Sequence, residues 1–126
     1  MNTKITIAGT SYDAVCNLGS EQFYRHLTGR DFNLDLTRVE RIARSEDVKE
    51  RQEAASELLE ITKKLAFIMI KQAGERDISR LLAGLTEADY IGWLCNFNPG
   101  DFTQETYTQI ITCWKKTKET SVPAKN

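Results

Sequence analysis

The chain has 126 residues, of which 40% are hydrophobic and 28% charged, and its 17 basic and 18 acidic side chains leave a formal net charge of -1. A domain of this size buries roughly two thirds of the surface that its unfolded chain exposes, so we expect one sizeable core. The near-zero net charge excludes a global field that would attract nucleic acid or an anionic membrane.

The first predicted element is a β-hairpin over residues 4–16. Apolar residues alternate with polar ones on both sides of Gly9, which suits the turn. The alternating residues are Ile5, Ile7, Tyr12, Ala14 and Cys16. Two strands alone are marginally stable, so this hairpin is expected to lie against helices.

A short helix is predicted over residues 17–28. Gly29 should end it, because glycine readily takes the left-handed conformation found after many helices. The residues expected to face inward are Leu18, Phe23 and Leu27. The next segment is predicted to be a loop held against the core by Phe32, Leu34 and Leu36.

A second helix is predicted to start at Thr37, because Thr37 and Glu40 have the spacing of a capping box. Its outer face is expected to carry a basic stripe of Arg38, Arg41 and Arg44. Its inner face is expected to carry Val39, Ile42 and Ala43.

The strongest helical signal covers residues 48–73. One face carries apolar residues at helical spacing, namely Leu58, Ile61, Leu65, Ile68 and Met69. The first half has the charged back of a solvated helix, whereas residues 65–70 are apolar almost all round. We therefore expect the second half to be the central core element, ended by Gly74.

Three further helices are predicted in the C-terminal half. The first covers residues 77–83, with Ile78, Leu81 and Leu82 inward. The second is capped by Thr86 and Asp89 with a staple of Leu85 and Tyr90, and runs to Cys95 or Asn96. The last covers residues 103–118, with Tyr107, Ile110, Ile111 and Trp114 on one face.

The turn at residues 98–101 is predicted to be type II, since Pro99 and Gly100 suit its two central positions. Together the elements predict a mainly α (α+β) fold, in which the N-terminal β-hairpin packs on a compact bundle of about five to six helices. Residues 1–120 are expected to form this single helical domain, and residues 121–126 a flexible tail.

Catalytic, metal-binding and cofactor-binding motifs are not recognised in the sequence. The only histidine, His26, has no cysteine at ligand spacing, and no serine or cysteine has another histidine as a base. No glycine-rich phosphate loop is present. The sequence therefore predicts a protein that is not an enzyme and takes no cofactor.

The cysteines and the N-terminus indicate a compartment. Cys16, Cys95 and Cys113 are odd in number and lack a C-x-x-C pair, which favours buried thiols over a disulfide framework. The N-terminus lacks the apolar run of a signal peptide, and residues 65–70 are far too few to span a bilayer. We expect a soluble, cytoplasmic protein.

Two surfaces are candidates for partner binding. Trp93 and Phe97 belong to a helix with more apolar surface than it needs inside, so they are predicted to form a partner face. Arg38, Arg41 and Arg44 could contact phosphate or an acidic protein surface, although three arginines are few for a nucleic-acid footprint.

The order of elements resembles the tail assembly chaperones of long-tailed bacteriophages and prophages. The resemblance is one of layout over most of the chain, carried by the hairpin of residues 4–12, the helix end at residues 27–31, the apolar helix around residues 65–70, the helix start at residues 85–89, the final helix of residues 107–114 and a polar, lysine-bearing tail. The charged segment of residues 37–52 departs from the family's layout.

The resemblance implies a small helical protein in the bacterial host cytoplasm that binds the tape measure protein and assists tail tube assembly. It implies the tail tube protein as a further partner and no catalytic residue; self-association stays open. The family often has a longer, frameshifted form. The alternative is a small regulatory or nucleic-acid-associated module that uses the arginine stripe, and an enzyme built around His26 is a third reading.

Overall fold

The structure, a computed structural model, describes the backbone of residues 2–121 and the side chains as far as Lys115. It has a two-stranded antiparallel sheet, β1 (Asn2–Ile7) and β2 (Thr10–Val15), followed by helices. The helices are α1 (Leu18–Thr28), α2 (Phe32–Ala43), α3 (Val48–Gly74), α4 (Ile78–Ala83), α5 (Glu87–Leu94) and α6 (Gln104–Ser121). The predicted mainly α (α+β) fold is confirmed. Of the predicted tail, residues 121–126, Ser121 is instead the last residue of α6, and residues 122–126 lie outside the described residues.

The hairpin has the predicted turn at Gly9. Ala8 and Gly9 have φ values of 54° and 78°, which match the twist of two-residue hairpin loops. Ile5 and Ile7 are fully buried on the inner face. Helix α6 covers the free edge of β1 at Thr6, whose N–H donates to Gln109 Oε1 at 2.8 Å and whose carbonyl accepts from the Thr106 hydroxyl at 2.6 Å.

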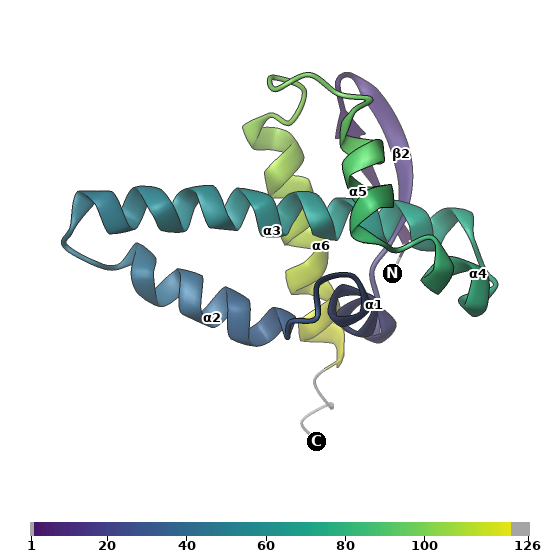
Figure 1. Cartoon of the computed structure of the whole chain (residues 1–126), viewed down its shortest axis with the longest axis horizontal. Helices are drawn as coiled ribbons and strands as arrows, with labels where there is room; N and C mark the ends of the chain where they lie inside the picture. The colour runs from purple at the N-terminus through teal and green to yellow at the C-terminus, as the bar shows by residue number, and fades with distance from the viewer. Residues whose placement is uncertain (1, 122–126) are drawn as a thin grey trace.

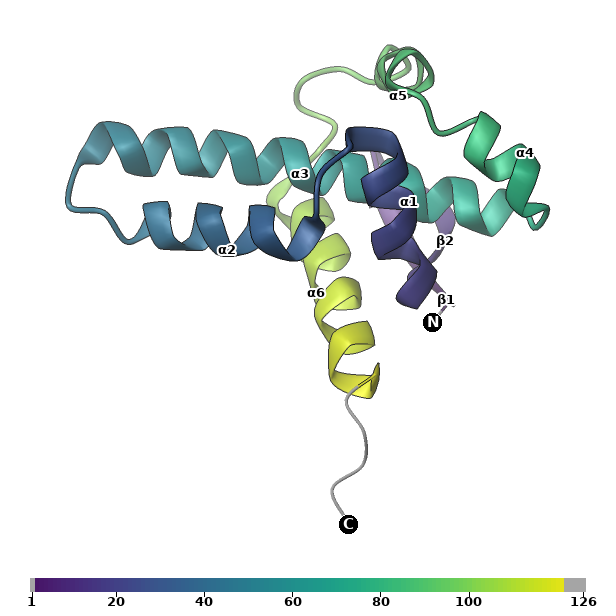
Figure 2. The same ribbon diagram turned by 60° about the horizontal axis from the view of Figure 1, so that its bottom comes forward.

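Helix α3 is the axis of the molecule, as Figures 1 and 2 show. Residues 65–69 are fully buried, as predicted for the central core element. Its first turns project from the other elements with α2 antiparallel beside them, and α6 meets α3 near Leu58 and Leu59. We call α2 together with residues 48–61 of α3 the arm, and the remaining described elements the body.

Helix α2 begins five residues earlier than predicted. Gly29 ends α1 with a φ of 72°, as expected, but Asp31 then caps a new helix by accepting the Leu34 N–H at 2.9 Å. The prediction of a loop after Gly29, followed by a helix that starts at Thr37, is therefore wrong. A helix that starts here has Phe32 on its inner face, where it is buried, and Leu34 on its outer face, where it is 72% exposed.

Three other local predictions are corrected. Leu18 and Ile78 were expected to face inward but are exposed, because each is the first residue of its helix and lies beside the cap. The turn at residues 98–101 forms, with the Asp101 N–H donating to the Asn98 carbonyl at 2.9 Å. It is not type II, since Gly9 and Gly29 are the only glycines of the described chain with positive φ.

Candidate protein-binding surface

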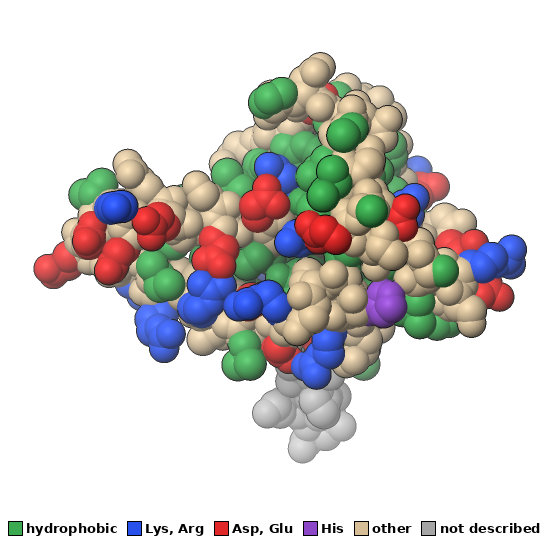
Figure 3. All heavy atoms as spheres, viewed as in Figure 1, with side chains coloured by type: hydrophobic (Ala, Val, Ile, Leu, Met, Phe, Trp, Pro, Cys, Tyr) green, Lys and Arg blue, Asp and Glu red, His purple; other side chains and the backbone are tan. Residues whose placement is uncertain are grey.

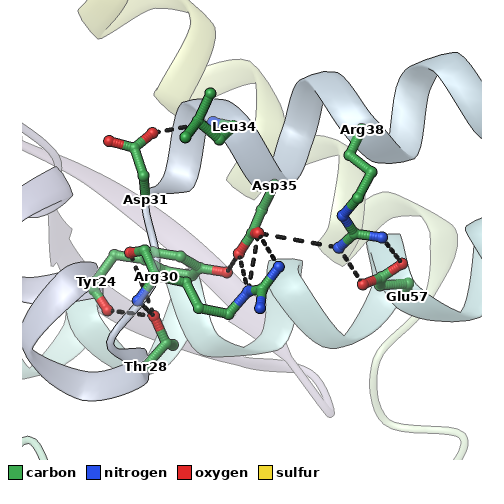
Figure 4. A network of polar contacts seen from close by, with 8 residues as sticks. All are labelled: Tyr24, Thr28, Arg30, Asp31, Leu34, Asp35, Arg38 and Glu57. Carbon is green, nitrogen blue, oxygen red and sulfur yellow. Dashed lines mark hydrogen bonds and ion pairs between the residues drawn. The ribbon is translucent and has the colours of Figure 1, made fainter.

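A buried carboxylate joins α1 to α2 (Figure 4). Asp35 is 4% exposed, and its carboxylate accepts from Arg30 Nε at 2.9 and 3.0 Å and from the Tyr24 hydroxyl at 3.0 Å. The hydrogen bond from Arg30 lowers the pKa of Asp35. Burial raises the pKa of Tyr24, so its hydroxyl keeps the proton that it donates. The donors point at one acceptor inside the fold, which is the arrangement of a structural clamp.

The predicted arginine stripe is divided between two roles. Arg38 does not lie on the outer face of α2 as predicted. It lies between Asp35 and Glu57 and forms a bidentate ion pair with Glu57 (Figure 4). Arg41 and Arg44 are exposed, and neither pairs with a carboxylate among the described side chains. Figure 3 shows basic side chains gathered over α2 below an acidic row on α3. The alternative reading as a nucleic-acid module thus retains only two of its three arginines.

Trp93 and Phe97 are brought together, as the hypothesis of a shared partner face requires. Their ring centroids lie 5.0 Å apart, and Trp93 also packs on Phe67 at 5.4 Å and Phe102 at 6.0 Å. Phe97 reaches Tyr12 of β2 at 6.4 Å. Both rings are half-buried. They hold α5 and the segment after it onto α3 and the hairpin, so much of their surface serves the fold.

A groove lies on the other side of α3, where α6 crosses it. Its volume is about 550 Å³. Helix α3 lines it with Ala55, Leu58, Leu59 and Thr62, and α6 lines it with Gln104, Tyr107, Thr108, Ile111, Thr112 and Lys115. Lys115 is the only charged residue among them. The groove is therefore an apolar, almost uncharged hollow on a chain with 28% charged residues.

Several large apolar side chains are exposed outside the core. They are Leu18, Leu34, Val48, Leu59, Ile78 and Ile91. Leu34, Val48 and Leu59 belong to the arm, and Leu59 lines the groove. Scattered apolar residues are ordinary on protein surfaces, but those that adjoin a hollow extend its contact area.

Groups that could perform chemistry are dispersed. Among the described side chains, residues 2–115, no three His, Cys, Asp or Glu gather as ligands of a metal ion. His26 is exposed, with its Nε2 2.9 Å from the Leu82 carbonyl, and so links α1 to α4. Cys16 and Cys113 are buried as predicted, whereas Cys95 is exposed because it caps the end of α5; none forms a disulfide.

The fold and the groove define a small helical protein with a projecting two-helix arm. Comparison with the profiles of known families, with curated proteins and with solved structures finds no match to this chain. No helix among residues 2–121 is both long and apolar enough to cross a membrane.

The groove was missed by sequence reasoning, although a signal for it exists. Helix α3 has a second stripe at a spacing of seven and four residues, Val48, Ala55 and Leu59, one position after the inner stripe of buried Ala54, half-buried Leu58 and buried Ile61. Two adjacent stripes on one helix indicate two neighbours. The clamp at Asp35 was missed because Arg30 and Asp35 were assigned to a loop.

Proposed function

We propose that this protein is a tail assembly chaperone of a long-tailed bacteriophage or prophage. In this role it binds the tape measure protein, keeps its apolar segments in solution and assists assembly of the tail tube. The observation that carries the proposal is the apolar groove between α3 and α6, together with the exposed apolar residues of the arm that lead to it.

A chaperone of this kind must present apolar area that its own fold does not require. Val48 and Leu59 are 57% and 40% exposed, so they contribute little to the core. The large, fully buried side chains are others, among them Ile5 and Ile7 of the hairpin, Tyr24 of α1, Phe32 of α2, residues 65–69 of α3 and Ile110 of α6. Client binding and folding are thus assigned to different residues, which supports a binding role.

The layout of the elements supports the same proposal. The hairpin, the helix ended by Gly29, the long apolar helix and the helix that starts after Thr86 occur in the order that carries the resemblance. The groove also suits the kind of client proposed, because a long helical protein exposes apolar stripes before it is enclosed by the tail tube.

Co-expression tests the proposal. An apolar helical segment of the tape measure protein encoded beside this chain should be insoluble alone and soluble with the full chain, and the two should co-purify. The gene should also lie between a tail tube gene and a very long tape measure gene. If no tail component co-purifies with the full chain from phage-producing cells, the proposed function is wrong.

A further inference from the structure

The charges of α3 are segregated around the arm. Glu53, Glu57 and Glu60 follow one another at spacings of four and three residues, and so form one row. Glu57 binds Arg38 of α2, and Glu60 accepts a hydrogen bond from the Tyr90 hydroxyl of α5. The acidic row therefore faces α2 and α5. Burial raises the pKa of Tyr107 in the groove, and only Glu60, the last member of the row, lies near enough to raise it further.

The groove side of α3 has the opposite character. No carboxylate lines the groove, and its single charged residue is Lys115. Arg51 lies four residues before Ala55, and Lys63 four residues after Leu59, so helical spacing puts one cation beside the stripe between Val48 and Ala55 and another at its C-terminal end. Lys63 forms an ion pair with Glu60, with 3.4 Å between Nζ and Oε1. Arg51 donates to the Ser45 carbonyl, and neither Arg51 nor Lys115 pairs with a described carboxylate.

The open stripe has the length and spacing of a helix-binding seam. Val48, Ala55 and Leu59 are exposed, and the buried Thr62 follows at helical spacing, so the stripe covers 15 residues of α3, which is about 21 Å or four turns. The arm has only two helices, and α2 covers the neighbouring stripe. A third helix laid along this seam would end against Tyr107, Thr108 and Ile111 of α6.

We propose that the α3–α6 groove binds an amphipathic client helix whose apolar stripe is bordered by Asp or Glu residues. The apolar stripe packs on Ala55, Leu59 and Ile111, and the bordering carboxylates face Arg51 and Lys115. This inference rests on the proposed function in that it names the site and the chemistry of the client segment. Charge complementarity of this kind selects the partner and the register as much as it strengthens binding.

Synthetic peptides test the charge preference on the full chain. Two fluorescent peptides of about 18 residues share a leucine and alanine stripe at helical spacing. One carries Glu beside the stripe, and the other carries Lys at the same positions. Anisotropy titration at low salt should show the Glu peptide binding at least about tenfold more tightly than the Lys peptide. Equal affinities, tighter binding of the Lys peptide or no binding of either peptide would overturn the inference.

Substitutions locate the site. Leu59→Glu and Thr108→Glu each place a carboxylate in the groove, and each should lower the affinity for the Glu peptide at least about tenfold. Ile91→Glu is the matched control, since Ile91 is an exposed apolar residue of α5 outside the groove. This variant should bind the Glu peptide with the affinity of the parent. Thr108 is exposed, so its variant keeps the test valid if Leu59→Glu unfolds. Lys115→Glu should reduce or reverse the difference in affinity between the Glu peptide and the Lys peptide.

The outcomes separate the site from the function. If the groove variants still solubilise the tape measure segment as the parent does, the groove inference is wrong and the chaperone proposal stands. If the parent prefers the Glu peptide but retains no tail component, the groove inference stands and the client is another protein.

Discussion

The body and the arm are held together by different forces. In the body, residues 65–69 of α3 are fully buried against the hairpin and α6, so each element there is fixed by apolar contacts from several sides. In the arm, two helices share a narrow seam of buried Val39, Ala54 and Ile61, supported by the ion pair of Arg38 in α2 with Glu57 in α3. The body thus supplies stability, and the arm supplies surface that a partner can cover.

The largest effect is expected from Ile68→Asp in the body. Ile68 is fully buried, and an ionised carboxylate at this position would have no partner, which costs several kcal/mol. The variant should lack a cooperative thermal transition in circular dichroism. A melt unchanged from the parent would remove residues 65–69 from the core.

The next largest effect is expected from the aromatic cluster. Trp93→Ala together with Phe97→Ala removes the rings that hold α5 on Phe67 and Tyr12, and should lower the free energy of unfolding by about 3 kcal/mol. Urea denaturation measures the change. If the double variant keeps the parent's stability but loses its client, these two residues form the partner face and the groove does not.

Asp35→Asn tests the clamp at the base of the arm. It leaves Arg30 and Tyr24 with a neutral acceptor in a buried site, and should cost about 2 kcal/mol at neutral pH. Asp13→Asn, in an exposed pair with Lys4, is the control and should cost little.

The pH dependence of the clamp follows from the lowered pKa of Asp35. Its contribution to stability is present above the carboxyl's unfolded pKa and is lost as the pH falls through the lower folded value. Urea denaturation of the parent should therefore show a loss of stability in the acid range that is smaller in Asp35→Asn. Equal slopes in the two proteins would contradict a role for this carboxylate.

The smallest effects should come from two apolar residues of α2. Val39 is buried against α3, so Val39→Ala should cost about 1 kcal/mol. Leu34 is exposed, and Leu34→Ala should change the stability by less than about 0.5 kcal/mol. If Leu34→Ala were the costlier change, the phase assigned to α2 would be wrong.

The elements that the sequence predicted well are those in which one local signal decides the structure. Residues 65–70 of α3 are apolar all round, and the hairpin alternates on both sides of Gly9, so few other arrangements bury them. The start of α2 could not be predicted in the same way, because Asp31 and Thr37 both have capping signals. The start at Asp31 is favoured because it lets Phe32 pack on Tyr24 and Trp114 in the core. These are tertiary contacts, which a local signal does not contain.

The candidate site was less predictable for a related reason. Trp93 and Phe97 are predicted from the surplus apolar surface of their helix, but the rings that half-bury them come from β2, α3 and the segment before α6. The groove depends on the crossing of α6 over α3, which no spacing within either helix encodes. A stripe in sequence indicates that a helix has a neighbour, whereas only the fold shows whether that neighbour is present.

Hydrogen exchange of the full chain, free and bound to a tape measure segment, shows whether the client occupies the groove. The bound client should slow amide exchange in residues 48–62 and 104–115, which line or adjoin the groove, and leave exchange in the hairpin unchanged. Protection confined to residues 90–97, or no change anywhere in the chain at saturating client, would contradict binding in the groove.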